Sequence, residues 1–388
     1  MFLGEYLSRD LIHHLVIFQA AILLIAGVNI ILIRKTRRYQ LPGSPPSVSI
    51  LVPARNEEAN IGACVASLLE QDHPDFEVIV LDDGSTDQTR QILEDLSRSQ
   101  PTLTVLEGKP GLTGHPGKNW ACSQLAEAAR GELLFFTDAD TIHDPETTSK
   151  VVAALEGTKA DLVTGYPRQL LGTWGERLLV PFFSWAVLVF FPLGLAYRLK
   201  TPLFTTAVGQ LMVFRRKAYQ TIGGHSGVSA SIVDDLALAR KIHQAGLRWR
   251  IIQITDLISC RMYRTGREAL NGFSKNLFAA FEFRLIPFIF AFTWLGVVYL
   301  LPLILLLLHL AGWAPLAQPD HLLVCVILSF LTWLLPYLHL GIPGWLAALY
   351  PLTVLANLFS AVRSLWRSTR GELTWKDRTI QPDSWKWL

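Results

Sequence analysis

Long apolar segments toward both ends of the chain constrain its fold most. The first, Leu11 to Ile33, exceeds the about 20 residues that a helix needs to cross a bilayer. Basic residues follow this segment, between positions 34 and 38, and do not precede it. That order favours a retained anchor over a cleaved signal peptide. By the positive-inside rule the anchor delivers residue 34 onward to the cytoplasm.

A second apolar region covers residues 285–365. Proline and glycine divide it into three candidate transmembrane helices, Leu285–Leu310, Leu322–Leu340 and Trp345–Leu365. The basic tail, residues 366–388, favours a cytoplasmic end, but three crossings from a cytoplasmic domain would put it outside. The number of crossings and the side of the tail therefore stay open, and one segment could be re-entrant or lie along the membrane surface.

A third apolar run, residues 178–196, lies between Arg177 and Arg198 and contains two prolines. If it crossed the membrane, the acidic segments before and after it would lie on opposite sides. Those segments are expected to build one site, so we predict an interfacial or re-entrant helix. Its aromatic side chains are predicted to contact lipid: Phe182, Phe183 and Trp185.

Between the apolar regions the sequence alternates short strands with helices. The expected strands are Ser47–Pro53, Phe76–Leu81, Leu103–Leu106 and Leu133–Thr137, and the expected helices are Glu57–Glu70, Thr86–Arg98 and Lys118–Arg130. Such alternation predicts an α/β fold with a mainly parallel sheet. Ligands of such sheets bind outside the carboxyl ends of the strands.

Carboxylates follow three of these strands. The segment Pro53–Glu57 follows the first strand, Asp82 and Asp83 the second, and Asp138 and Asp140 the fourth. Like charges gathered at one edge of a sheet repel, so a cation or a hydrogen-bonding ligand is expected among them.

Composition and motifs exclude several other classes. A net charge of +3 with only 17% charged residues does not favour a nucleic-acid partner. The four cysteines are far apart, so neither a disulfide framework nor a zinc site is expected. No Walker A or G-x-G-x-x-G motif follows a strand, and the nearest match, Gly111–Lys118, contains a proline.

Five motifs occur in the order found in family 2 glycosyltransferases, and the chain resembles that family over residues 47–280. They are Pro53–Glu57, Asp82–Asp87, Phe136–Asp140, Gly209–Gln210 and Val233–Asp235. The resemblance implies a GT-A domain that binds a nucleotide-diphosphate sugar, here between an N-terminal anchor helix and C-terminal transmembrane helices. Further motifs at Gly117–Ala121, Asp235–Ala239 and Cys260–Arg264 resemble the membrane-bound branch, which includes hydroxychlorobactene and other carotenoid glucosyltransferases.

The resemblance assigns the donor site residue by residue. Base and ribose would be held by the first two loops, at Pro53, Ala54, Arg55, Glu57, Asp82 and Asp83. Carboxylates suit this role because they accept hydrogen bonds. Diphosphate and acceptor would lie near Lys118, Gly209, Gln210, Arg261 and Arg264. We also expect Ser85 or Thr86 to cap the next helix, which is compatible with ligand binding by the same loop.

Asp138 and Asp140 are the predicted metal ligands. Residues two apart in an extended chain point to the same side, so both carboxylates can face one ligand. Oxygen ligands suit Mg²⁺ or Mn²⁺, which bridges to substrate phosphates. By resemblance Asp140 is the direct ligand, and Asp138 reaches ribose or a bound water. The alternative is a solvated loop.

Asp235, with Asp234, begins an expected helix over Leu236–Gln244. The resemblance makes Asp235 the general base of a single, inverting displacement. Asp234 stands where the family has Glu, and an acidic pair that complements the helix dipole is the alternative.

Together these features predict a multi-pass enzyme of the cell membrane with a cytoplasmic catalytic domain. We expect transfer of one sugar, first of all glucose from UDP-glucose, to a hydroxyl of a lipophilic acceptor such as a carotenoid, another isoprenoid or a glycerolipid. The alternatives are a polyprenyl-phosphate glycosyltransferase, a polysaccharide synthase or a non-catalytic nucleotide-sugar-binding component. The Gln-x-x-Arg-Trp motif of processive synthases is absent, since Gln244–Trp249 has one residue too many.

Overall fold

The computed structural model describes residues 2–33, 36–110, 117–199, 201–313, 319–371, 374–375, 378–379 and 385–388. Parts of several sequence predictions lie outside these residues. They are the basic residues Arg34 and Lys35, the glycine-rich segment 111–116 and most of the basic tail, as well as the side chain of Arg37.

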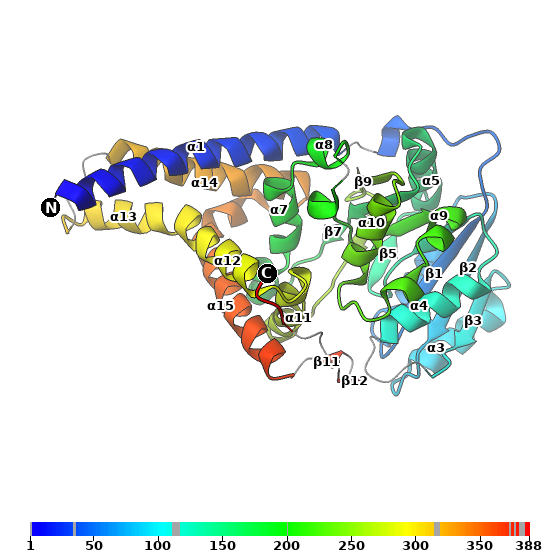
Figure 1. Ribbon diagram of the computed structural model, residues 1–388. Helices are drawn as coiled ribbons and strands as arrows, with labels where there is room; N and C mark the ends of the chain where they lie inside the picture. The colour runs from blue at the N-terminus through cyan, green and yellow to red at the C-terminus, as the bar shows by residue number, and fades with distance from the viewer. Residues whose placement is uncertain are drawn as a thin grey trace.

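The chain folds into an α/β domain from which long apolar helices project to one side (Figure 1). These helices are α1 (Phe2–Leu32), α12 (Leu285–Tyr299), α13 (Leu301–Leu310), α14 (Pro319–His339) and α15 (Tyr350–Thr369), with the 3-10 turn η4 (Gly344–Leu349) before α15. Four segments of the described chain are long and apolar enough to cross a membrane: Asp10–Leu32, Leu285–Leu310, Pro319–His339 and Gly344–Thr369. The predicted apolar helices at both ends are therefore present.

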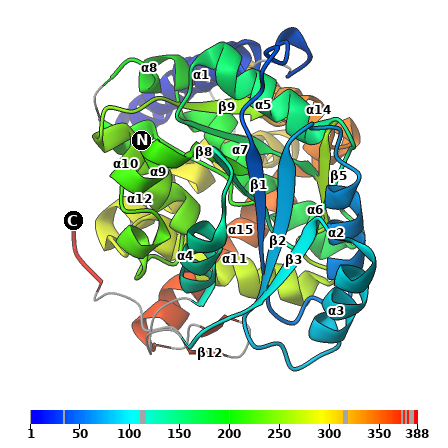
Figure 2. The ribbon, with the colours of Figure 1, turned by 90° about the vertical axis from the view of Figure 1, so that its right-hand side faces the viewer.

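A seven-stranded sheet forms the centre of the α/β domain, in the order β3-β2-β1-β4-β8-β6-β9 (Figure 2). Its strands are β1 (Val48–Ala54), β2 (Phe76–Asp82), β3 (Leu103–Glu107), β4 (Leu133–Phe136), β6 (Leu162–Tyr166), β8 (Met212–Arg215) and β9 (Trp249–Gln253). Only β8 runs antiparallel to its neighbours, so the sheet is mainly parallel, as the sequence predicts.

Helices cover both faces of this sheet because successive strand residues point to opposite sides. Ile50 of β1 belongs to the buried cluster that includes side chains of α2 and α5, whereas Leu51 belongs to the cluster that includes side chains of α4 and α10. The surrounding elements are η1 (Thr36–Arg38), α2 (Ile61–Leu69), α3 (Thr89–Ser99), α4 (Gly117–Ala128), α5 (Thr147–Thr158), α9 (Arg216–Thr221), η3 (His225–Val228) and α10 (Asp234–Gln244). The four predicted strands and their helices are confirmed, although α2 begins at Ile61 and not at Glu57.

Shorter elements join the domain to the apolar helices. They are a small sheet of β5 (Thr141–His143), β10 (Ile258–Cys260) and β7 (Arg168–Gln169), the helices α6 (Trp174–Leu179), α7 (Pro181–Phe190), α8 (Leu193–Ala196) and α11 (Gly266–Ala280), and the turn η2 (Pro202–Phe204). The ribbon pair β11 (Thr374–Trp375) and β12 (Arg378–Thr379) follows α15.

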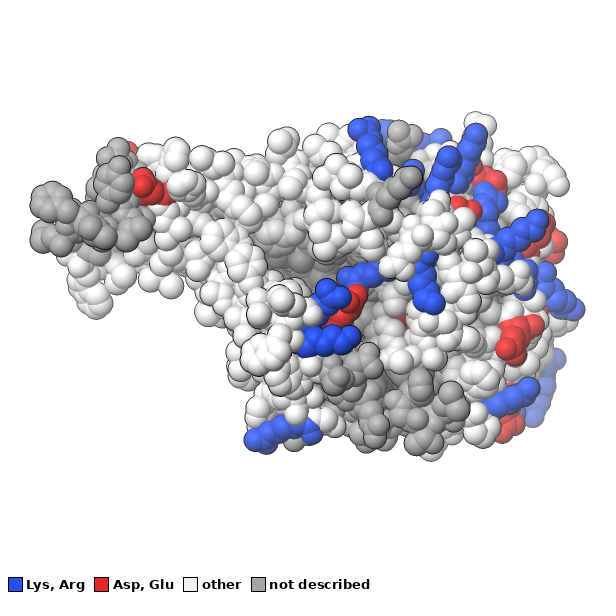
Figure 3. All heavy atoms as spheres, viewed as in Figure 1, with Lys and Arg blue, Asp and Glu red and all other residues white. Residues whose placement is uncertain are grey.

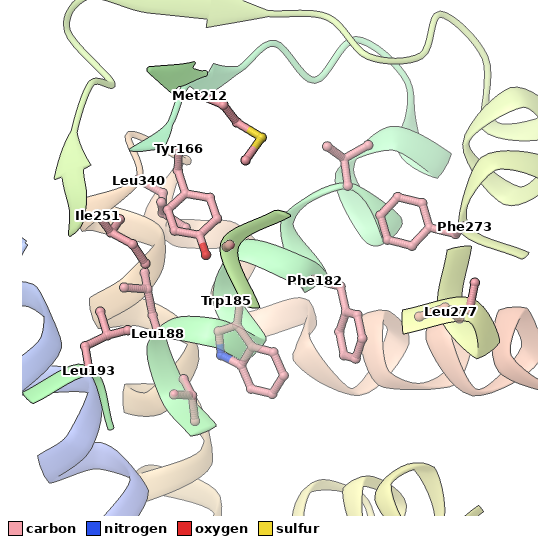
Figure 4. Close-up of a cluster of buried hydrophobic side chains, with 14 of the residues drawn as sticks. Tyr166, Phe182, Trp185, Leu188, Leu193, Met212, Ile251, Phe273, Leu277 and Leu340 are labelled. Atoms are coloured by element: carbon pink, nitrogen blue, oxygen red, sulfur yellow. The ribbon is translucent and has the colours of Figure 1, made fainter. Parts of the chain in front are cut away.

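The prediction that the aromatic residues of segment 178–196 contact lipid is wrong for two of them. Trp185 is fully buried and stacks on Trp333 of α14 at 3.7 Å between ring centroids, and its Nε1 donates to the carbonyl oxygen of Thr332. Phe182 is also buried, within the same cluster (Figure 4). Segment 178–196 is broken into the end of α6, α7 and α8. The aromatic rings of α7 lie between the long apolar helices and the α/β domain, because α14 packs against α7 and offers an apolar surface there.

Candidate active site

The loops after β1, β2 and β4 meet at one edge of the sheet. Strand β1 lies between the other two, with Ala54 opposite Asp82 and Leu51 opposite Phe136. All three strands run parallel, so their carboxyl ends and the acidic loops that follow lie side by side. The proximity of these loops, expected from the sequence, is thus a property of the strand order.

A single cavity of about 1640 Å³ opens at this edge. Its lining includes all but one of the residues that the sequence singles out: Pro53, Ala54, Arg55, Glu57, Asp83, Lys118, Asp138, Asp140, Gly209, Gln210, Asp234, Asp235, Arg261 and Arg264. Figure 3 shows the surface hollowed between the charged α/β domain and the nearly uncharged helices, with charged side chains beside the hollow. Residues from seven separate parts of the chain therefore share one space.

Asp82 is the exception, since it is buried behind the cavity lining. Its carboxylate accepts hydrogen bonds from the backbone N–H and the hydroxyl of Ser85. The prediction that Ser85 or Thr86 caps the next helix is wrong, because α3 begins only at Thr89. Asp87 instead accepts from the backbone N–H and the hydroxyl of Thr89. This acidic turn is thus held largely by its own hydrogen bonds.

The loops after β1 and β2 are joined to each other by hydrogen bonds. Nη1 of Arg55 donates to the carbonyl oxygen of Asp83 at 2.6 Å. Asn56, at a positive φ of 51°, donates its backbone N–H to Ser85 and accepts from the backbone N–H of Thr86. The two loops therefore present one preformed polar wall to the cavity.

Lys118 lies among the carboxylates that line the cavity. Its Nζ lies 2.6 Å from Oδ1 of Asp138. Burial opposes the ammonium charge, but the carboxylates of Asp138 and Asp234 outweigh it and hold the pKa of Lys118 well above its usual range. Lys118 therefore stays positive and compensates part of the acidic charge.

Asp140 has a free carboxylate oxygen. Its Oδ1 is buried and has no hydrogen-bond partner. Burial, with the charges of Asp138 and Glu57, raises the pKa of Asp140 to about 7. On its other side lies Cys260, whose Sγ accepts a hydrogen bond from Gln210 Nε2 at 3.5 Å.

This arrangement fits a divalent cation of the kind that uses few protein ligands. Within the described ranges no three His, Cys, Asp or Glu side chains are placed to hold a metal together. Mg²⁺ is commonly bound by one or two carboxylates, with substrate phosphates and water completing its shell. The unpaired oxygen of Asp140, beside Asp138, is compatible with that mode of binding.

Asp235 and Asp234 begin α10 and face the same space. Oδ2 of Asp235 accepts the backbone N–H of Gly209 at 2.9 Å. Burial and the neighbouring charge of Asp234 raise the pKa of Asp235 to about 7. Asp234 lies 3.7 Å from Nε2 of His225, a buried ring whose other nitrogen contacts the hydroxyl of Tyr219. Burial lowers the pKa of His225 to about 4, so this ring is neutral.

The two arginines after β10 also line the cavity. Nε of Arg261 lies 3.5 Å from the buried carboxylate of Glu176 in α6. Nη2 of Arg264 donates to Asn60 Oδ1 at 2.7 Å and so reaches the loop after β1. The sequence analysis missed Glu176 and His225. Thr173-x-x-Glu176 is a capping box that the sequence displays, whereas no local pattern marks a lone histidine as a partner of Asp234.

The cavity also has an apolar arm that runs toward the long helices. Side chains of α7 and α12 line most of it, with one residue from α1: Phe183, Val187, Phe190, Pro287, Phe290, Ala291, Trp294, Leu295, Val298 and Phe18. The polar end and the apolar arm belong to the same cavity. One ligand can therefore place a polar group among the carboxylates and a hydrocarbon chain between the helices.

Gly209 lies among the charged groups of the polar end, and we expect its substitution to affect activity according to the size of the new side chain. A Cβ added here would lie 3.5 Å from Lys118 Nζ, 3.6 Å from Asp235 Oδ2 and 3.8 Å from Asp138 Oδ2. These are ordinary contacts, so we expect Gly209→Ala to keep most activity. Gly209→Leu extends into the space between the charges and should lower kcat/KM about 10²-fold, the cost of displacing reacting groups by about 1 Å. Equal kcat/KM for both variants, at unchanged melting temperature, would contradict this placement.

Part of the chain is similar to known proteins. Residues 49–223 match glycosyl transferase family 2. This segment, somewhat less than half of the chain, is similar to that family. Together with the mixed α/β sheet and the flanking apolar helices, this match confirms the GT-A type of fold that the motifs predict.

Two kinds of relative share this domain. The β-monoglucosyldiacylglycerol synthase of Nostoc sp. (strain PCC 7120) is 29% identical over 238 residues, which cover 58% of this chain and 48% of that protein. The 4,4'-diaponeurosporenoate glycosyltransferase of Staphylococcus aureus (strain USA300) is 26% identical over 259 residues, covering 62% of this chain and 64% of that protein. The match thus spans about half of the cyanobacterial protein. The predicted resemblance to the family and to its carotenoid glycosyltransferases is confirmed.

Solved structures with a similar chain path include the mannosyltransferase PcManGT from Pyrobaculum calidifontis in complex with GDP-Man and Mn²⁺. It is 21% identical, covers 91% of this chain and 99% of that chain, and has a TM-score of 0.48. S. aureus TarS 1–349 in complex with UDP is 17% identical, covers 85% and 93%, and has a TM-score of 0.40.

Proposed function

We propose that this family 2 glycosyltransferase transfers one sugar from a nucleotide-diphosphate sugar to a hydroxyl group of a membrane lipid. The observation that carries the proposal is the continuity of the cavity, which joins a charged end to an apolar arm between α7 and α12. A soluble acceptor needs no such arm. Relatives named as a monoglucosyldiacylglycerol synthase and a diaponeurosporenoate glycosyltransferase support a lipid acceptor, and UDP-glucose is the first donor to test.

The donor would lie across the charged end. Glu57, Asp83 and their loops would accept hydrogen bonds from base and ribose, and Lys118 with Arg261 would face the diphosphate. Asp140, with Asp138, would hold Mg²⁺ or Mn²⁺, which supplies charge neutralisation on the leaving diphosphate. Asp82 supports this site from behind by fixing the turn that presents Asp83.

The reaction would be a single displacement at the anomeric carbon. Asp235 takes the proton of the acceptor hydroxyl as that oxygen bonds to the anomeric carbon. The bond from this carbon to the diphosphate breaks on the opposite face, so the configuration inverts. Gly209 positions the Asp235 carboxylate through its backbone N–H, and this bond requires no side chain at position 209.

The reaction should depend on pH through Asp235. The base must be ionised, and its pKa of about 7 means that the protonated, inactive form dominates at lower pH. We expect kcat/KM to fall about tenfold per pH unit below 7. Asp140 has a similar pKa, so Asp234→Asn serves as the discriminating variant. Removing the charge of Asp234 should move the acid limb to lower pH. A limb that stays in place would mean that another group titrates.

Filling the apolar arm tests the lipid acceptor. Val187 of α7 lines the arm and is only partly exposed. A tryptophan at this position should weaken lipid binding by about 1–3 kcal/mol, or about 5- to 150-fold, because it overfills the space. Donor binding, measured by titration of the nucleotide sugar, should be unchanged.

Ile31→Trp is the matched control, because Ile31 lies exposed on α1 outside the cavity lining. Transfer to lipid that survives Val187→Trp undiminished would refute an acceptor in this arm.

We further propose that the protein is a multi-pass protein of the cell membrane, with the α/β domain on the cytoplasmic side.

A further inference from the structure

Helix α15 is long and apolar enough to cross a membrane, but hydrogen bonds join it to α6 and α11, the helices next to the α/β domain. The backbone N–H of Phe278 in α11 donates to Ser364 Oγ at 3.0 Å, and Arg363 Nη2 donates to Asn271 Oδ1 at 2.7 Å. Nearer its start, Asn357 Nδ2 donates to the carbonyl oxygen of Leu178 in α6. These polar bonds hold residues 357–364 of α15 against α6 and α11, and α11 lines the cavity.

The opposite face of α15 is an exposed apolar stripe, which we call the outer stripe: Leu352, Leu355, Phe359, Val362 and Trp366. Each of these side chains is at least 51% exposed. Their spacing of three or four residues places them on one face of the helix. The buried face carries small polar residues, among them Thr353, Ser360 and Ser364. The helix thus turns its apolar side away from the protein.

The path of the chain shows where α15 begins. Three other apolar segments, α1, α12–α13 and α14, each have one end at the α/β domain and the other far from it (Figure 1). At the domain end, Asn29 of α1 donates to the carbonyl oxygen of Leu188, and Gln253 of β9 donates to that of His339 in α14. After three passes the chain is therefore back at the domain before α15 starts.

The chain after α15 is also found at the domain end. The carbonyl oxygens of Lys386 and Trp387 accept the backbone N–H groups of Leu285 and Ile286 at 2.8 and 3.1 Å. The N–H of Lys386 donates to Phe283. Helix α12 has no side-chain cap, so this segment satisfies N–H groups that its first turn leaves unpaired. A crossing by α15 would separate residues 385–388 from the start of α12.

We infer that α15 lies along the membrane surface with its outer stripe in the lipid, so that three segments cross and the tail returns to the side of the active site. The lipid of the bilayer covers the outer stripe. The domain ends of the three crossing segments mark the level of the membrane surface that faces the α/β domain. The guanidinium of Arg370 lies 4.2 Å from the ring centroid of Trp366. Tryptophan and long cationic side chains favour the level of the lipid headgroups.

The depth of the stripe tests this inference in the full-length protein. Single cysteines at Leu352, Phe359 and Trp366 would carry an environment-sensitive fluorophore in liposomes that contain nitroxide lipids. We expect all three to be quenched alike, and more by a nitroxide near the headgroups than by one near the bilayer centre. Leu24→Cys, exposed on α1, should show the reverse order. Strongest quenching of Phe359 by the deep nitroxide, with weak quenching at Leu352 and Trp366, would show a crossing helix.

Sidedness gives a second readout that does not depend on the transfer reaction. The four native cysteines are buried, so a membrane-impermeant maleimide reports on introduced ones. In sealed membranes of one orientation, Trp387→Cys should react from the same side as Ser99→Cys on the α/β domain. Trp313→Cys, at the far end after α13, should react only from the other side. Reaction of Trp387→Cys together with Trp313→Cys would overturn the inference.

Discussion

Asp235→Asn is expected to lower turnover about 10²- to 10⁴-fold, the usual contribution of a general base. Asparagine keeps the size of the side chain and can still accept the N–H of Gly209, but it cannot take a proton from the acceptor. The affinity for the nucleotide sugar should change little. Initial rates of sugar transfer and equilibrium titration of the donor measure the two effects separately.

Asp95→Asn is the matched control, because Asp95 lies exposed on α3 and pairs with Arg98. It should leave both rate and affinity unchanged. Full activity of Asp235→Asn would contradict the assignment of the base. It would instead favour an acceptor that is already ionised, such as a polyprenyl phosphate, which needs little help from a base.

Asp140→Asn is expected to remove the dependence of donor binding on a divalent cation. Changes at groups that only support a metal ligand already cost about 10- to 100-fold in metal affinity, and loss of the ligand itself should cost no less. In the wild-type protein Mn²⁺ or Mg²⁺ should therefore tighten binding of the nucleotide sugar by at least about tenfold. In the variant, binding with the cation should equal binding with a chelator.

Asp256→Asn is the matched control, because it removes the same charge as Asp140→Asn. Asp256 is a half-exposed carboxylate near Arg168. This variant should retain the cation effect. If the cation tightened binding equally in wild type and Asp140→Asn, the metal would be held elsewhere or by the donor alone. If it had no effect in either protein, the assignment of a metal to Asp138 and Asp140 would fail.

The elements that the sequence predicts well are those set by local pattern. The buried β-branched strands and the acidic segments after them could be located because parallel strands place their carboxyl ends together. The gathering of Asp83, Asp138 and Asp235 at one cavity follows from that rule and from the family motifs. The inward-facing Asp82 could not be distinguished from Asp83, because its role depends on the turn that Ser85 completes.

Tertiary packing decides the remaining features. Trp185 resembles an interfacial anchor in sequence, yet it is buried because α14 supplies Trp333 as a stacking partner. His225 becomes a neighbour of Asp234 only when η3 packs near the start of α10. Helix α15 has the length of a transmembrane helix, and only its bonds to α11 and the pairing of residues 385–388 separate it from the other apolar segments.

Lipid-dependent sugar transfer is the most direct test of the central claim, that one cavity brings a nucleotide sugar to a membrane lipid. Detergent-purified protein would be incubated with a panel of radiolabelled UDP- and GDP-sugars, with Mn²⁺ or Mg²⁺, and with or without a total lipid extract. We predict that label from one donor enters the organic phase only when lipid is present, and that Asp235→Asn and Val187→Trp abolish or strongly reduce it. Binding of a nucleotide sugar without transfer to any lipid would contradict the claim and identify the protein as a nucleotide-sugar-binding component.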